Sequence, residues 1–150
     1  MTRIRVSSEL EDARQTVLQS LRHYRSMVAN YQACKELYDQ LFPSSTQMLT
    51  DMPKAPTESY EPERYASRRL DLRARMEDSL DEMIDEYQQI EIMVRSVSGD
   101  YNTVLTRRYM LNESWEVIAD KMHCERTTVW RWHNAAVMKM ANEKLQHRAT

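Results

Sequence analysis

The stretch SWEVIADKMHCERTTVWRWH, residues 114–133, gathers the side chains of this chain that are best suited to chemistry. Its tryptophans, histidines and single cysteine could form a metal or redox site, a buried core, or a surface that recognises a partner. A structural zinc site needs four ligands, mostly in close pairs, whereas this stretch offers His123, Cys124 and a distant His133. The spacing therefore predicts no metal, and we expect no cofactor.

The composition predicts an all-α protein. The chain has 150 residues, of which 41% are hydrophobic and 29% charged, and it holds one glycine and four prolines, too few for many strand-to-strand turns. Cys34 and Cys124 are the two cysteines, and no apolar run resembles a signal peptide or a membrane span. We expect a cytoplasmic protein without membrane contact. No carboxylate pair, nucleophile–base set or glycine-rich phosphate loop is recognisable, so we do not expect an enzyme.

Residues 1–98 have the pattern of an antiparallel, coiled-coil-like helical hairpin. Ser8 with Glu11 forms a capping box that predicts the start of a helix over 9–42, and Pro62 suits the first position of a helix over 62–98. Between them, the proline-rich residues 43–61 predict a long loop. The apolar positions that recur at heptad spacing are Leu10, Val17, Leu21, Tyr24, Val28, Tyr31, Tyr38, Phe42, Met76, Leu80, Met83, Tyr87, Ile90, Val94 and Val97.

Residues 99–150 predict a second unit of three helices. Gly99 is expected to end the second helix in a left-handed conformation, and Asp100 to cap the next one. Ser114 caps WEVIADKM, and residues 123–125 form a tight turn before a longer helix over 126–146. Two helices joined by such a turn are typical of a helix-turn-helix.

The charges are distributed unevenly between the two units. Residues 101–150 contain eight Lys or Arg against five Asp or Glu, whereas residues 1–100 contain 13 against 18. The basic end of the chain suggests a polyanionic partner. The acidic run EDSLDEMIDE on the second helix is either a solvated face or a surface for a basic partner.

The sequence VLTRRYMLNESWEVIADKMHCERTTVWRWHNAAVMKM resembles region 4 of bacterial sigma factors, and more closely phage transcriptional regulators of the ArpU/RinA type. The resemblance rests on Arg108-Tyr109, Trp115-Glu116, Ile118-Ala119, Thr128 to His133 and Ala136. It covers about residues 101–141, and a weaker match extends to the loop SSTQMLTDMPKAP. The chain departs from the family before its last helix, where Cys124-Glu125 replaces the usual Ser or Thr cap. Glu125 there would repel a phosphate.

The exposed side of the last helix supplies the candidates for DNA contact. Arg pairs bidentately with guanine, Asn pairs with adenine, and Thr or an indole edge touches a thymine methyl. The base-reading candidates are Arg126, Thr127, Trp130, Arg131 and Asn134. The phosphate-binding candidates are Arg107, Ser114, Lys121, Thr128 and Lys139. Trp132 is expected in the core, Trp115 partly buried, and His133 hydrogen-bonded or half-exposed rather than catalytic.

The sequence thus predicts a sequence-specific regulator that binds double-stranded DNA. The resemblance implies a phage or prophage protein in a bacterial host that activates late genes, with RNA polymerase as a further partner. The hairpin would then supply a homodimer contact or a polymerase contact. Two alternatives stay open: a helical adaptor that binds protein and not DNA, and a packaging component resembling a small terminase subunit.

Overall fold

A computed structural model describes residues 2–43 and 62–149 of the chain, with side chains from residue 7 onward. Every regular element in these ranges is a helix, which confirms the all-α prediction. The elements are α1 (Thr2–Leu41), α3 (Pro62–Arg95), α4 (Asp100–Leu105), the π-helix η1 (Thr106–Met110), α5 (Trp115–Lys121) and α6 (Arg126–Ala149). No helix in the described ranges is long and apolar enough to cross a membrane.

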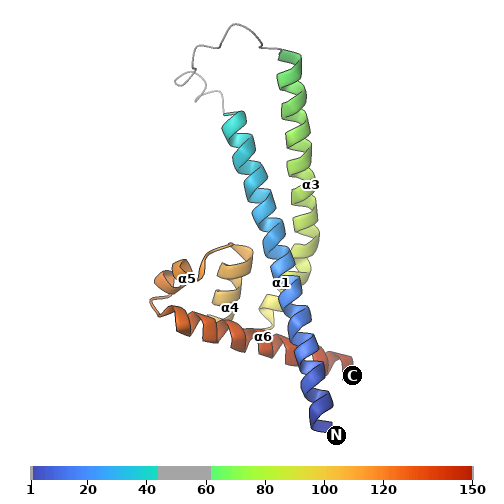
Figure 1. Ribbon diagram of the computed structural model, residues 1–150, viewed down its shortest axis with the longest axis vertical. Coiled ribbons are helices and arrows are strands. Elements are labelled where there is room, and N and C mark those ends of the chain that lie inside the picture. Colours follow the sequence, from blue (N-terminus) through green and yellow to red (C-terminus); the bar gives the residue numbers. More distant parts are fainter. Residues whose placement is uncertain (1, 44–61, 150) are drawn as a thin grey trace.

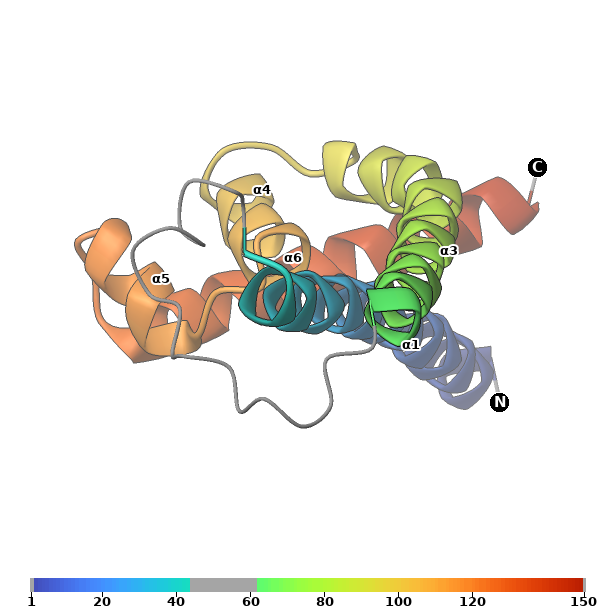
Figure 2. The same cartoon turned by 90° about the horizontal axis from the view of Figure 1, so that it is seen from above.

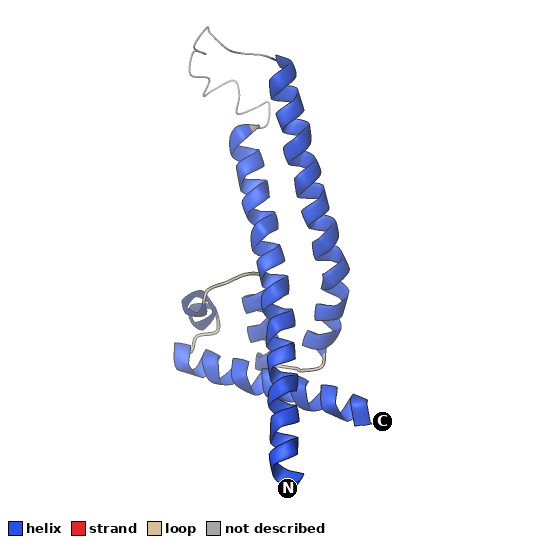
Figure 3. Ribbon diagram, turned by 45° about the vertical axis from the view of Figure 1, so that its right-hand side comes forward, coloured by secondary structure: helices blue, strands red, loops and turns tan. Residues whose placement is uncertain are grey.

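Helices α1 and α3 run antiparallel and side by side (Figures 1 and 3). The predicted heptad positions face each other, but they are fully buried only in the lower half, where Val17, Leu21 and Tyr24 meet Ile90 and Val94. Higher up, the same stripe remains partly exposed. Two helices alone cover only one face of each other, and full burial requires a third element.

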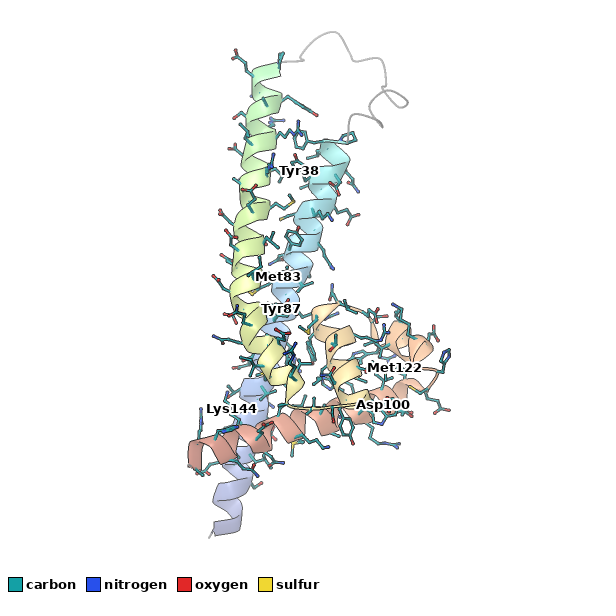
Figure 4. All side chains as sticks on the ribbon, turned by 180° about the vertical axis from the view of Figure 1, so that it is seen from behind. Tyr38, Met83, Tyr87, Asp100, Met122 and Lys144 are labelled. Carbon is teal, nitrogen blue, oxygen red and sulfur yellow. The ribbon has the colours of Figure 1, made fainter. Side chains whose placement is uncertain are left out.

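The side chains of the hairpin illustrate this limit (Figure 4). Tyr87 was expected in the seam, yet it is 39% exposed and touches Tyr24 with a ring-centroid distance of 6.4 Å. Met83 is partly buried against the hydrophobic cluster that contains Tyr24 and Ile90. Tyr38 lies near the end of the hairpin at which α1 ends and α3 begins, and its hydroxyl accepts a hydrogen bond from Arg69 Nε at 3.1 Å.

Helix α6 crosses the lower end of the hairpin, α4 stands to one side of α1, and α5 lies farther out on the same side (Figures 1 and 2). The main hydrophobic cluster joins the hairpin residues to Leu105, Tyr109, Ala136, Val137 and Met140 of the C-terminal helices. A smaller cluster of Val104, Ile118, Ala119 and Val129 holds α4, α5 and α6 together. The chain before Gly99 and the chain after it therefore share one core.

Three helix boundaries differ from the sequence-based predictions by more than one residue. Helix α1 begins at Thr2 and not after Ser8, because no glycine or proline interrupts residues 2–8 and a formed helix extends at little cost. Helix α3 ends at Arg95, three residues earlier than predicted, and α6 continues to Ala149. The predicted loop 43–61 lies, apart from Pro43, outside the described residues.

The hinge at Gly99 also has a different role from the predicted one. Its φ of 66° is positive, as predicted, but its ψ of −138° lies outside the left-handed helical region, and Gly99 is the N-cap of α4 and not the C-cap of α3. Its carbonyl accepts a hydrogen bond from the backbone N–H of Thr103 at 3.1 Å. Asp100 is accordingly the first residue of α4 and does not cap it.

Candidate nucleic-acid interface

Helices α5 and α6 are joined by a tight turn that local hydrogen bonds define. Ser114 caps α5 as predicted, because its Oγ accepts a hydrogen bond from Val117 N at 3.3 Å. After α5, His123 has a φ of 54°, and the backbone N–H of Cys124 donates to Ala119 O at 3.1 Å. Glu125 O then accepts from Thr128 N at 3.0 Å and starts α6. The turn thus holds the amino end of α6 beside α5.

The amino-terminal half of α6 extends past α1 and away from the hairpin (Figures 1 and 3). Its inner side is buried through Val129 and Ala136, and Trp132 is partly buried in the smaller cluster. The five predicted base-reading residues all lie on the opposite, exposed side: Arg126, Thr127, Trp130, Arg131 and Asn134. Neither the hairpin nor the core covers this face.

The five side chains of this face have different surroundings. Arg126 Nη1 forms an ion pair with Glu116 Oε1 at 2.9 Å, with both side chains well exposed. Trp130 is 51% exposed and makes an edge-on contact with Trp115, with ring centroids 5.2 Å apart. Asn134 Oδ1 lies 3.3 Å from His133 Nδ1. For Thr127 and Arg131, the described part of the chain supplies no hydrogen bond or ion pair.

Two of the predicted phosphate contacts are engaged within the protein. Arg107 Nη1 lies 3.3 Å from both carboxylate oxygens of Glu113, and Lys121 Nζ also pairs with Glu113. The hydrogen bond from Lys121 is the main reason that the pKa of Glu113 is lowered; Arg107 adds to it. A phosphate group would have to compete with this carboxylate for either cation. Sequence reasoning missed Glu113 as the centre of a cluster that ties η1 to α5.

The other phosphate candidates lie on different parts of the surface. Ser114 is exposed, although its hydroxyl already accepts the capping bond. Thr128 is partly buried in the first turn of α6. Lys139 is exposed further along α6, with its Nζ 4.6 Å from the ring centroid of Tyr101.

Behind the exposed face lies an aromatic cluster that local sequence patterns do not reveal. His133 is 3% exposed, and its Nε2 lies 2.6 Å from the hydroxyl of Tyr109. The ring of Trp130 stacks on His133 with centroids 5.5 Å apart, and Trp115 meets His133 edge-on at 5.0 Å. The Arg108 guanidinium lies over the ring of Trp115, 4.2 Å from its centroid. Of the two predicted states of His133, the hydrogen-bonded one is observed.

Burial controls the ionisation of this cluster. It is the main reason that the pKa of His133 is lowered to about 4; the nearby cations Arg108, Arg22 and Arg14 contribute in the same direction, while the hydrogen bond to Asn134 opposes them. Burial also raises the pKa of Tyr109. Both groups are therefore neutral at physiological pH, and the imidazole has one donor and one acceptor nitrogen.

Comparison with known proteins places the chain in a family. Residues 57–142 match the family described as "Protein of unknown function (DUF722)". The chain belongs to this family. No curated protein and no solved structure matches the chain significantly.

The family match has a clear relation to the fold. It includes α3, α4, η1 and α5 and ends at residue 142 within α6, so the exposed face of α6 and its aromatic cluster lie inside it. Helix α1 precedes the matched residues, although it packs against η1 and α6 in the shared core.

The residues first considered for metal binding are not arranged as a ligand set. His133 is committed to Tyr109 within the cluster, while His123 is exposed in the turn next to Cys124. In residues 2–43 and 62–149, no group of three or more His, Cys, Asp or Glu side chains is placed to hold a metal ion.

Proposed function

We propose that this member of the family is a sequence-specific regulator that binds double-stranded DNA and controls transcription of phage or prophage genes. In this proposal α5, the turn and α6 form a helix-turn-helix, and the amino-terminal half of α6 enters the major groove. The observation that carries the proposal is the exposure of Arg126, Thr127, Trp130, Arg131 and Asn134 on one side of α6. These residue types recognise base edges in the major groove.

The geometry of the unit agrees with such a role. The two helices are joined by residues 122–125, and Val129 and Ala136 anchor α6 in the core while the opposite side stays open. The amino end of α6 projects away from the hairpin (Figure 3), so α3 would not block a DNA duplex from reaching it. The resemblance to sigma factor region 4 and to ArpU/RinA-type regulators supports the same role and suggests activation of late genes next to RNA polymerase.

One helix presents too small a surface for tight specific binding, since a single module buries only about 600–1,000 Å² of protein surface on DNA. We therefore propose that the hairpin supplies a second function, either a homodimer that binds paired half-sites or a contact with RNA polymerase. Exposed apolar side chains are available for this on α3, at Leu70, Ile84 and Ile92.

A selection of random double-stranded oligonucleotides with the full-length protein tests the proposal. An enriched motif supports it, and a symmetric motif indicates a dimer. We expect the affinity for the motif to fall steeply as salt rises, because counterions are released when phosphates are bound. Failure to enrich any motif at low salt would refute the proposal.

Two substitutions then separate base reading from backbone contact. Arg131→Ala should cost about 1–3 kcal/mol of binding free energy on the selected motif and relax the preference at one base pair. Lys139→Ala should weaken binding to all sequences about equally. Arg73→Ala, an exposed arginine of α3 that pairs with Glu77, is the matched control and should change neither. Equal behaviour of the Arg131 and Lys139 variants on cognate and random DNA would contradict these roles.

A helical adaptor that binds protein and not DNA is the second candidate, favoured by the exposed apolar and acidic side chains of α3. Salt separates the two candidates. An apolar contact between helices persists at high salt, whereas DNA binding does not.

A further inference from the structure

Tyr109, His133 and Asn134 form a continuous chain of hydrogen-bonding groups that leads from the core to the exposed face of α6. The Tyr109 hydroxyl lies 2.6 Å from His133 Nε2, and His133 Nδ1 lies 3.3 Å from Asn134 Oδ1. We propose that Tyr109 and His133 are positioning residues that hold the Asn134 carboxamide in one orientation, so that it reads an adenine in the major groove. This inference rests on the proposed DNA-binding function.

The direction of the chain follows from the needs of the buried tyrosine. Tyr109 is 3% exposed, so its O–H must find an acceptor within the protein. Among the described residues, the hydroxyl is paired with His133 Nε2 and with no other polar group. Tyr109 therefore donates to Nε2, and since the buried imidazole is neutral, its proton is on Nδ1.

The tautomer of His133 in turn decides the orientation of Asn134. A protonated Nδ1 donates, and it requires the carboxamide oxygen and not the amide nitrogen as its neighbour. The oxygen has two lone pairs, so it can accept from His133 and still accept from a second donor. The outer lone pair and the Nδ2 hydrogens then remain available on the exposed side of α6.

The surrounding rings prevent the imidazole from turning over. Trp130 stacks on one face of His133, Trp115 meets it edge-on, and the ring is 3% exposed. Arg108 in turn holds Trp115 by its contact at 4.2 Å. A flipped imidazole would leave the Tyr109 hydroxyl without an acceptor, which is costly in a buried site.

An acceptor and a donor side by side on one carboxamide match adenine, which offers the N6 amino group as donor and N7 as acceptor in the major groove. Guanine offers two acceptors at the same positions and does not match. A bidentate contact of this kind discriminates against the other bases by roughly 5- to 150-fold. Without a fixed orientation, the carboxamide would also present its nitrogen and oxygen in the reverse order.

The binding experiment uses the full chain and the DNA motif that it selects from a random pool. We expect the motif to contain an adenine whose replacement weakens binding roughly 5- to 150-fold, and Asn134→Ala to abolish that preference. Tyr109→Phe, which removes only the hydroxyl, should lose most of the same preference and leave the other positions of the motif unchanged. The double variant should lose no more than Asn134→Ala does. Tyr101→Phe, the same change in α4 outside the chain of hydrogen bonds, should bind as the wild type.

A measurement without DNA tests the hydrogen-bond chain by itself. The nitrogen-15 NMR shifts of the His133 ring in the free protein should show the proton on Nδ1, and in Tyr109→Phe the Nε2–H tautomer should become populated. Circular dichroism checks that the variant is folded. The wild-type measurement needs no variant and decides the matter even if Tyr109→Phe does not fold.

The outcomes distinguish the inference from the proposed function. A wild-type proton on Nε2, or a Tyr109→Phe variant that keeps the full adenine preference, overturns the positioning role and leaves the DNA-binding proposal intact. A protein that enriches no motif overturns the proposed function and the adenine reading together, whatever the tautomer is.

Discussion

Lowering the pH should destabilise this protein through His133. Burial holds the pKa of His133 at about 4 in the folded protein, against about 6.5 in an unfolded chain. A group whose folded pKa lies below its unfolded pKa takes up its proton only in the unfolded state over that interval. Its contribution to stability is therefore complete above pH 6.5 and is lost as the pH falls toward 4.

The magnitude follows from the two pKa values. Each tenfold difference in proton affinity is worth about 1.4 kcal/mol, so the interval from 6.5 to about 4 corresponds to about 3 kcal/mol of unfolding free energy. The positive charges of Arg108 on η1 and of Arg22 and Arg14 on α1 act in the same direction as burial. A loss of about 3 kcal/mol is a large part of the unfolding free energy of a typical domain, which is about 5–15 kcal/mol.

Urea denaturation followed by circular dichroism between pH 4 and pH 8 measures this effect in the wild type and in His133→Gln. Carboxylates such as Glu113 also lose stabilising charge in acid, but they do so in both proteins, so the difference between the two curves isolates His133. We expect the wild type to lose about 3 kcal/mol more than the variant as the pH falls. His23→Gln, at an exposed position of α1, should retain the wild-type curve.

A difference between wild type and His133→Gln that stays constant from pH 8 to pH 4 would refute the reasoning. It would mean that the imidazole is hydrated, or that it finds a counter-charge, in the folded protein.

Three further substitutions test how the fold holds the candidate interface. Leu21→Ala should cost about 2–5 kcal/mol of unfolding free energy, because Leu21 is fully buried in the core that α1 shares with α6. Ser114→Ala removes the cap of α5 and should cost about 1 kcal/mol. Gly99→Ala should cost about 1–3 kcal/mol through backbone strain alone, since a φ of 66° disfavours a side chain and no atom lies within 4 Å of an added Cβ. Urea denaturation at pH 7 measures all three.

Matched controls accompany these variants. Leu37 on α1 is 46% exposed. Leu37→Ala should therefore cost less than 1 kcal/mol of unfolding free energy, because surface substitutions usually change it by no more than about 0.5 kcal/mol. Ser98→Ala, next to the hinge, should be close to neutral. A Leu21→Ala protein as stable as Leu37→Ala would contradict the shared core, and a neutral Gly99→Ala would contradict the strained hinge.

Much of the local structure follows from the sequence alone. The low glycine content and the heptad spacing are enough to predict two long antiparallel helices, and Pro62 marks the start of the second one. Ser114 is a cap and Gly99 has a positive φ because these properties depend on a residue and its near neighbours. The exposed set on α6 also follows from local spacing, since 3.6 residues per turn place residues 126, 127, 130, 131 and 134 on one side.

The helix ends were less predictable for a related reason. A capping box at Ser8 marks a favourable start, but nothing in residues 2–7 prevents the helix from continuing. In the same way Gly99 could have capped either neighbouring helix, and the turn after Arg95 decided in favour of α4.

Sequence by itself therefore determined the long helices, the Ser114 cap of α5 and the side of α6 that faces outward, because each of these depends on residues within one or two turns. Only the tertiary structure decided what lies behind that face. Tyr109 meets His133 across 24 residues, and Asn112 donates to Gln32 across 80. Such contacts arise from the packing of η1 and α6 against α1, where shape and burial select partners that no local periodicity specifies.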